Sequence, residues 1–172
     1  ATVAMATTAR LAEAGALVDS AAFAGHSLGE YTALSAYGRV MPVETTISIV
    51  FQRGSTMHSL VPRDADGASN YRMGALRPNQ AGIKADEVEA YVRSISEATG
   101  EFLQIVNHNL AGVQYAVAGT IKGLDALAAD ARAKAKARGG KNPFMFVPGI
   151  DVPFHSEVLR PGVPEFRGRL LE

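Results

Sequence analysis

The sequence predicts an α/β fold that is interrupted by a small α+β subdomain. An apolar run at 21–24 meets Gly25-x-Ser27-x-Gly29, and a helical pattern follows at once. Between residues 71 and 147 the elements follow the order β-α-β-β-α-β, the ferredoxin-like arrangement. We therefore expect three parts: residues 1–68 with the tight turn, residues 69–148 as the small subdomain, and residues 149–172 as a return to the first part.

The start of the chain is expected to form two helices around one short strand. Residues 1–14 are alanine-rich and predict a helix that stops at Gly15. Three of its residues are expected to face a core: Val3, Leu11 and Ala14. The apolar run 21–24 predicts a short buried strand, and the helix that begins at Ser27 runs to about Tyr37 and ends at Gly38.

A second long helix should follow, with Pro42 in its first turn, where a missing N–H is tolerated. Its apolar residues recur at helical spacing: Val43, Ile47, Val50, Phe51 and Met57. A polar loop at 62–70 then leads into the small subdomain.

The small subdomain is predicted from local start and stop signals. Its strands are expected at 71–76, 102–106, 113–118 and 144–147, with a turn at 78–82 and a loop at 107–112. Asp86-x-x-Glu89 resembles a capping box at the start of a helix that Gly100 closes. Thr120 can cap a second helix, which Gly139-Gly140 stops. One face of that helix is apolar: Leu124, Leu127, Ala128, Ala131 and Ala135.

Composition excludes several classes of function. The 17 basic and 17 acidic side chains cancel, so neither nucleic acid nor an anionic membrane is expected as the main partner. There is no cysteine, which excludes a thiol nucleophile, a disulfide framework and a cysteine zinc site, and fits a reducing compartment. The first strand arrives early for an open α/β sheet, so we expect the chain to be a piece of something larger.

The turn at residues 25–29 has the pattern of a nucleophile elbow, with Ser27 as the nucleophile. Glycines at 25 and 29 would let backbone approach backbone closely, where a Cβ would collide. Ser27 would sit at a helix N-terminus, where free N–H groups favour negative charge, and the Leu28 N–H would stabilise an oxyanion. The alternative is a structural turn that matches the pattern by chance.

A serine hydroxyl needs a base within hydrogen-bond reach, and the chain offers four histidines. His26 adjoins the nucleophile and points away from it, His58 lies on a helix, and His108 lies in the predicted loop 107–112. His155 lies far downstream in a loop, where serine enzymes of this topology carry their base, so topology favours His155. No acid stands out as its orienting partner: Asp64, Asp66 and Asp151 are present, with Asp151 close in sequence, and the simplest alternative is a backbone carbonyl from residues outside this chain. The residues from 156 onward look partly helical but are broken by Pro161 and Pro164.

Two basic features each allow two interpretations. Arg53 lies at the edge of the apolar stripe of its helix, where it could snorkel to water or bind a carboxylate in a cleft. Periodicity alone favours the first interpretation. The run Arg132, Lys134, Lys136, Arg138 and Lys141 predicts a solvated helix face, or else a docking face for an acidic carrier domain.

Three segments together resemble the malonyl-CoA:acyl carrier protein transacylase family. They are Gly25-His26-Ser27-Leu28-Gly29-Glu30-Tyr31, Gln52-Arg53-Gly54 and Val152-Pro153-Phe154-His155-Ser156, and the resemblance covers essentially the whole chain. It implies an α/β-hydrolase-like acyltransferase core, partial here, with an inserted ferredoxin-like subdomain. Further segments are most similar to the malonyl/palmitoyl transferase domain of type I fatty acid synthases: Ser69-Asn70-Tyr71, Ile105-Val106-Asn107-His108-Asn109, Gln114-Tyr115 and Leu159-Arg160.

The resemblance implies a set of roles. Ser27 and His155 would be catalytic, the Leu28 N–H would bind the oxyanion, and Arg53 would bind the malonyl carboxylate, which reverses the interpretation from periodicity. No metal and no tightly bound cofactor is expected; CoA thioesters and the carrier's phosphopantetheine would be substrates. The family's Gly-Gln-Gly loop, which supplies the second oxyanion N–H, and its late glutamine, which orients the histidine, have no match here, so the isolated chain is expected to be incomplete.

The resemblance also implies partners and a location. The partners would be an acyl carrier protein domain and other fatty acid synthase domains of the same polypeptide, in a large homo-oligomer, with no nucleic acid and no membrane. The location would be cytoplasmic. Two alternatives stay open: a serine hydrolase or thioesterase, and a non-catalytic carrier-docking fragment of a megasynthase.

Overall fold

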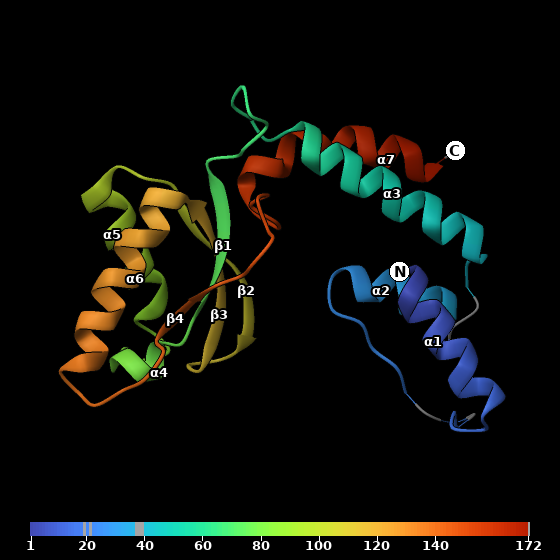
Figure 1. Cartoon of the computed structure of the whole chain (residues 1–172), viewed down its shortest axis with the longest axis horizontal. Coiled ribbons are helices and arrows are strands. Elements are labelled where there is room, and N and C mark those ends of the chain that lie inside the picture. Colours follow the sequence, from blue (N-terminus) through green and yellow to red (C-terminus); the bar gives the residue numbers. More distant parts are fainter. Residues whose placement is uncertain (19, 21, 37–39, 172) are drawn as a thin grey trace. The chain divides into compact units, whose positions relative to one another are not determined.

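The computed structural model describes residues 1–18, 20, 22–36 and 40–171 (Figure 1). They form two compact units: Ala1–Thr56 together with Pro164–Glu172, and Met57–Val163. The predicted division into residues 1–68, 69–148 and 149–172 remains a prediction.

The first unit is helical in its described residues. It holds α1 (Thr2–Glu13), α2 (Leu28–Ala36), most of α3 (Val43–Ser59) and nearly all of α7 (Val163–Leu171). Helices α1 and α2 pack together, and Gly15 ends the chain's first helix in the left-handed conformation, at φ 67°, as expected. The Thr56 hydroxyl donates to the Glu165 carboxylate over 3.5 Å and links α3 to α7.

Burial in the first unit differs from the prediction. Val3 and Leu11 are 81% and 44% exposed and Ala14 is exposed too, while Met5 is the buried residue of α1. Ala21 and the predicted helix end at Tyr37 and Gly38 lie outside the described residues. Residues 22–24 are exposed and join no ladder, so the prediction of a buried strand is wrong for them. A strand needs a neighbouring strand for its N–H and C=O groups, and this unit's described residues supply none.

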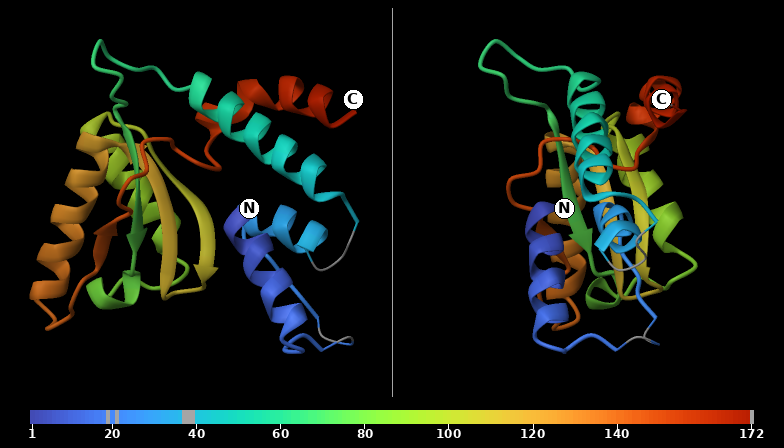
Figure 2. Two further views of the ribbon diagram at one scale, coloured as in Figure 1. Left: turned by 45° about the vertical axis from the view of Figure 1, so that its right-hand side comes forward. Right: turned by 90° about the vertical axis from the view of Figure 1, so that its right-hand side faces the viewer.

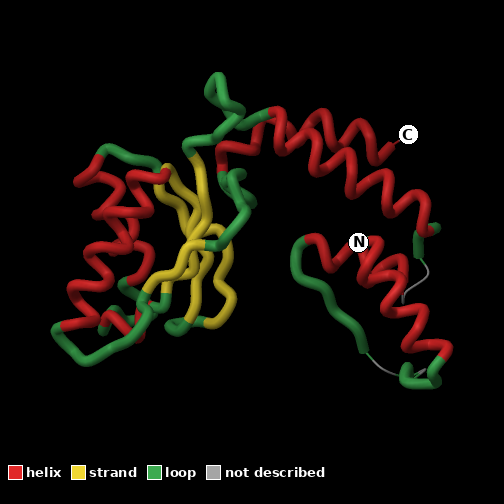
Figure 3. Tube along the Cα trace, viewed as in Figure 1, coloured by secondary structure: helices red, strands yellow, loops and turns green. Residues whose placement is uncertain are grey.

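The second unit is an antiparallel sheet covered on one face by helices. The strands are β1 (Tyr71–Leu76), β2 (Leu103–Leu110), β3 (Gln114–Thr120) and β4 (Phe144–Phe146), in the order β2-β3-β1-β4. Helices α5 (Val88–Thr99) and α6 (Ile121–Lys136) lie side by side on one face of the sheet (Figures 2 and 3). The predicted β-α-β-β-α-β order is therefore present, with a short helix α4 (Pro78–Ala81) where a turn was expected.

The core of this unit forms between α6, α5 and the covered sheet face. The predicted apolar face of α6 is buried throughout, and β1, β3 and β4 contribute Leu76, Tyr115, Val117 and Phe144. The Thr120 side chain accepts from the Gly123 N–H over 3.2 Å and caps α6, as predicted. Gly100 ends α5 at φ 67°, also as predicted. The expected capping box at Asp86 is absent, because Glu87 is the N-cap and its carboxylate accepts from the Lys84 N–H.

Two local predictions near the sheet are wrong. Residues 107–110 belong to β2 and not to a loop, because two register shifts let the polar segment stay paired with β3. The segment after residue 156 is not broken by its prolines. Pro161 lies inside a 3-10 helix (Glu157–Gly162), and Pro164 lies in the first turn of α7, where its missing N–H costs nothing.

Candidate active site

Ser27 stands on a strained turn at the N-terminus of α2. Its φ is +51°, a left-handed conformation that is uncommon for a serine. A Cβ added to Gly25 would lie 2.0 Å from the Gly29 carbonyl carbon, so the turn requires glycine at 25. At Gly29 an added Cβ meets no described atom within 4 Å, and the predicted collision there is wrong. The close approach is made by the backbone of residue 29 and needs no glycine there.

The backbone of this turn leaves a donor beside Ser27. The Gly29 N–H donates to the His26 carbonyl over 2.8 Å, and the Glu30 N–H donates to the Ser27 carbonyl over 3.0 Å. The turn itself uses these two N–H groups and not that of Leu28, the first residue of α2. Helix N-terminal N–H groups carry partial positive charge, so the Leu28 N–H suits a developing oxyanion.

Arg53 reaches Ser27 from α3. Its Nη2 donates to the Ser27 Oγ over 3.3 Å, and its guanidinium lies 5.7 Å from the centre of the Tyr31 ring. The structure therefore brings together two predicted site residues that are 26 positions apart. The structure adds Tyr31 to these two residues, a contact that the sequence analysis did not predict. Its position four residues after Ser27, on the same face of α2, was the signal that could have indicated it. Cation–π contact with Tyr31 holds the guanidinium beside the hydroxyl.

His155 lies in the second unit, in the loop that follows β4. Its side chain is exposed and its backbone is left-handed, with φ at +62°. The loop is locally closed: the Ser156 hydroxyl donates to the Pro153 carbonyl over 2.6 Å, and the Phe154 N–H donates to the Val152 carbonyl over 2.9 Å. Ser27 and Arg53 belong to the other unit, so the pairing of His155 with Ser27 remains a prediction.

The other histidines occupy three different settings. His26 is exposed and lines a cavity of about 640 Å³ between α1, α2 and residues 16–18 and 22–26. His58 is exposed in the last turn of α3. His108 lies in β2, with its ring 5.1 Å from that of Tyr115 and its Nε2 3.7 Å from a Glu89 oxygen.

Two of the three acidic candidates, Asp64 and Asp151, make contacts through their carboxylates within the second unit. Asp64 accepts from the N–H groups of Asp66 and Ala68, over 3.0 and 2.8 Å, and so shapes its own loop. Asp151 pairs with Arg63, a residue that sequence reasoning did not single out. Because the two lie in separate loops 88 residues apart, no local pattern signals the pair.

The basic run lies on the exposed side of α6 and just beyond it. All five side chains are exposed, as a solvated helix face requires: Arg132, Lys134, Lys136, Arg138 and Lys141. Lys134 pairs with Asp130 over 3.6 Å. Asp130 also accepts from the Tyr91 hydroxyl over 2.8 Å, and burial and this contact raise the pKa of Tyr91. The run thus partly serves the packing of α6 against α5, and the docking interpretation stays a prediction.

Within the described ranges, no helix is long and apolar enough to cross a membrane. The same ranges hold no group of three or more His, Cys, Asp or Glu side chains placed to bind a metal ion. The expectations about metals and cofactors stay predictions.

Comparison with known proteins places the chain in context. Residues 1–138 match the family described as "Acyl transferase domain". The chain is 38% identical over 183 residues to the fatty acid synthase beta subunit TOXC of Cochliobolus carbonum, an alignment that covers 87% of this chain and 9% of that protein. It is 42% identical over 113 residues to the fatty acid synthase subunit beta of Saccharomyces cerevisiae, covering 64% of this chain and 6% of that one.

Solved structures show the same fold. The chain superposes on an acyl-carrier-protein S-malonyltransferase of Burkholderia pseudomallei with a TM-score of 0.71 and 29% identity. The superposition covers 98% of this chain and 48% of that one. The mixed α/β architecture is therefore that of known S-malonyltransferases, and the chain spans about half of that enzyme and under a tenth of the two curated relatives.

Proposed function

Because this chain belongs to the acyl transferase domain family, we propose that it moves malonyl groups from CoA to an acyl carrier protein through an ester on Ser27. The observation that carries the proposal is the contact between Arg53 and Ser27: the Arg53 guanidinium lies 3.3 Å from the Ser27 hydroxyl. Ser27 itself lies on a turn where its backbone is left-handed. A nucleophile beside a fixed cation suits an acyl donor that also bears a carboxylate.

The reaction proceeds in two matched halves. His155 takes the proton of Ser27, and the Oγ attacks the thioester carbonyl carbon, whose oxygen becomes negative against the Leu28 N–H. The carbon–sulfur bond then breaks, and the CoA thiolate leaves with the proton from His155. In the second half the carrier thiol gives its proton to His155 and attacks the ester, and Ser27 leaves with that proton. The pairing of His155 with Ser27 is inferred from the sequence resemblance.

Arg53 supplies the preference for a short acyl group with a terminal carboxylate. In a malonyl group only one methylene separates the carboxylate from the thioester carbonyl. A carboxylate bound by a guanidinium that itself touches the Oγ therefore sets the carbonyl carbon beside the nucleophile. A substrate with an uncharged acyl group would leave the half-buried guanidinium without an anion, which costs binding free energy.

The relatives suggest the setting in which this chemistry occurs. Both curated relatives are fatty acid synthase beta subunits, so we propose a malonyl/palmitoyl transferase domain within a type I fatty acid synthase. Its architecture would be a partial α/β-hydrolase-like core with the four-stranded unit as an inserted ferredoxin-like subdomain. Its partners would be an acyl carrier domain and neighbouring synthase domains in a large cytoplasmic homo-oligomer, and its substrates CoA thioesters and carrier phosphopantetheine, with no bound cofactor.

Labelling with radioactive malonyl-CoA tests the proposal. In the whole protein, wild type is expected to take up label on Ser27 and pass it to added carrier protein, whereas Ser27→Ala takes up none. Persistent labelling of Ser27→Ala at the same site would overturn the assignment. Release of free malonate at the same rate with and without carrier would identify a hydrolase, and absence of labelling in wild type would leave the docking-fragment alternative.

A further inference from the structure

The loop that carries His155 is bound by Arg63, a residue of another loop that belongs to none of the three segments resembling the transacylase family. Arg63, between α3 and β1, donates from its Nη1 to the Asp151 carboxylate and, over 2.9 Å, to the Gly67 carbonyl. Asp151 precedes His155 by four residues in the same loop. All of these residues belong to the second unit.

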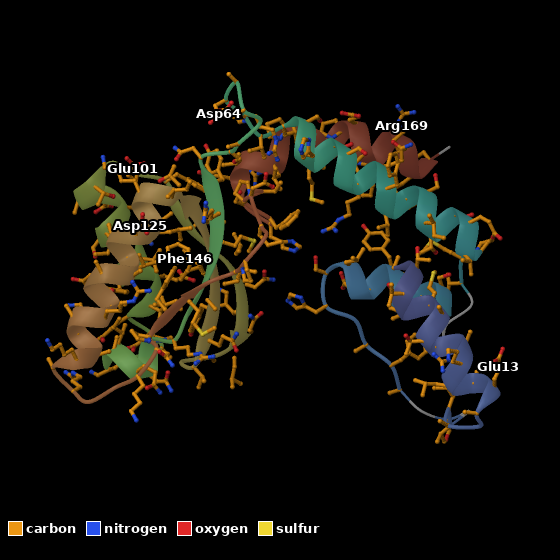
Figure 4. All side chains as sticks on the ribbon, viewed as in Figure 1. Glu13, Asp64, Glu101, Asp125, Phe146 and Arg169 are labelled. Carbon is orange, nitrogen blue, oxygen red and sulfur yellow. The ribbon has the colours of Figure 1, made fainter. Side chains whose placement is uncertain are left out.

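Arg63 is itself fixed, so it can act as an anchor. Its side chain is 17% exposed, low for an arginine. Its loop is closed by the Asp64 N–H, which donates to the Ala68 carbonyl over 3.0 Å, and by a bridge between Arg63 and Ser69. The carboxylate of Asp64, a residue labelled in Figure 4, accepts hydrogen bonds from two further N–H groups of that loop. An ion pair to such an arginine costs little further side-chain entropy when it forms.

The other end of the His155 loop is held by the sheet. The Glu157 N–H donates to the side-chain carbonyl of Gln104 on β2 over 2.9 Å. His155 thus lies between two attachment points, Asp151 and Glu157, and between them its φ is +62°. Histidine adopts a left-handed φ more often than most residues, and attachment on both sides of His155 holds this loop in that conformation.

We infer that Arg63 is a positioning residue for His155, which it holds in place through the ion pair with Asp151. This inference rests on the proposed function, in which His155 is the base. A base misplaced by about 1 Å loses much of its effect, because proton transfer needs hydrogen-bond distance at the moment of attack. Arg63 acts through the loop and touches no reacting atom.

The titration of Asp151 supports the pairing and provides a readout that needs no activity. The hydrogen bond from Arg63 lowers the pKa of Asp151 below its ordinary 3.8, and the charge of His58 adds a smaller lowering. The ion pair is therefore intact at neutral pH and is lost only as the pH falls through that lowered pKa. Arg63→Gln should return the pKa of Asp151 towards its ordinary value, which the carboxyl carbon resonance reports.

The kinetic test compares Arg63→Gln with Arg93→Gln in the whole protein. Arg93 is an exposed arginine on α5 of the same unit, so both variants lose one positive charge. We expect Arg63→Gln to slow Ser27 labelling at saturating malonyl-CoA by about tenfold, with the half-saturating concentration within about twofold and the melting temperature close to that of Arg93→Gln. Asp151→Asn, at a half-exposed carboxylate, should slow labelling equally, and the double variant should be no slower than either.

The outcomes separate this inference from the proposed function. Wild-type labelling together with an Arg63→Gln rate equal to that of Arg93→Gln would overturn the positioning role and leave the proposed function standing. A loss of rate that follows melting temperature alone, or that adds fully in the double variant, would also overturn it. Absence of labelling in the wild type would instead refute the proposed function, whatever the titration of Asp151 shows.

Discussion

Gly25→Ala is predicted to disable the elbow, although the new side chain is a single methyl group. The added Cβ would lie 2.0 Å from the Gly29 carbonyl carbon, 2.1 Å from its oxygen and 2.4 Å from the Glu30 nitrogen. All three are backbone atoms at the start of α2, so no side-chain rotation relieves the clash. The turn itself must open.

The size of the effect follows from that distance. Ordinary contact begins at 3.4 Å, so the two backbone segments must separate by about 1.4 Å. Ser27 lies between them, and its hydroxyl would move by a distance of the same order. Misplacement of a reacting group by about 1 Å costs roughly a hundredfold in rate. We therefore expect Gly25→Ala to reduce the rate of Ser27 labelling by about a hundredfold or more.

Gly29→Ala is the matched control, since it adds the same methyl group to the other glycine of the motif. That methyl meets no described atom within 4 Å, and alanine favours a helix over glycine by about 1 kcal/mol. Single-turnover labelling from malonyl-CoA and thermal melting are measured for both variants. Equal impairment of the two, or a Gly25→Ala rate near that of wild type, would refute the steric reasoning.

Two further predictions concern specificity and stability. Arg53→Ala should slow transfer of malonyl groups by about a hundredfold and change transfer of palmitoyl groups little, because only malonyl offers the carboxylate. Competition assays with both CoA thioesters measure this, and equal losses would mean that Arg53 is structural. Thr120→Ala should lower the free energy of unfolding by about 1 kcal/mol, because the Gly123 N–H loses its cap; urea denaturation measures this, and an unchanged midpoint and slope would contradict it.

The small α+β unit could be predicted because its local signals are complete in themselves. Gly100 ends a helix in the left-handed conformation, and Thr120 caps the next one through its own side chain. The apolar face of α6 meets strands from the same unit. Where a signal depended on pairing, prediction failed: Asn107 to Leu110 look like a polar loop, yet register shifts keep them in β2.

Burial in the first unit could not be predicted, because it depends on surfaces that the periodicity does not specify. Val3, Leu11 and Ile47 recur at positions typical of a buried face, but each is at least 40% exposed. Periodicity identifies the apolar side of a helix and says nothing about what covers it. The same reason applies to residues 22–24, which are apolar but pair with no strand among the described residues.

For the candidate site too, the sequence predicted the residue types but not which of them make contact. The helical wheel left Arg53 between two interpretations, since a wheel does not show which residues of another helix lie opposite. The structure decides between them, since the Arg53 side chain on α3 reaches the Ser27 hydroxyl before α2. The Arg63–Asp151 pair lies beyond any such reasoning, because the two residues sit in separate loops 88 positions apart, whose proximity only the folded structure shows.

Backbone strain offers evidence about the site that is independent of motifs. In the described part of the chain, three residues other than glycine have positive φ: Ser27, Asn142 and His155. Asparagine adopts this conformation readily, and histidine more often than most residues. Serine has no such ease, and glycine at 27 would relieve the strain at no steric cost. A serine at this strained position therefore supports the proposed nucleophile over a turn formed by chance, since a nucleophile needs the hydroxyl and such a turn does not.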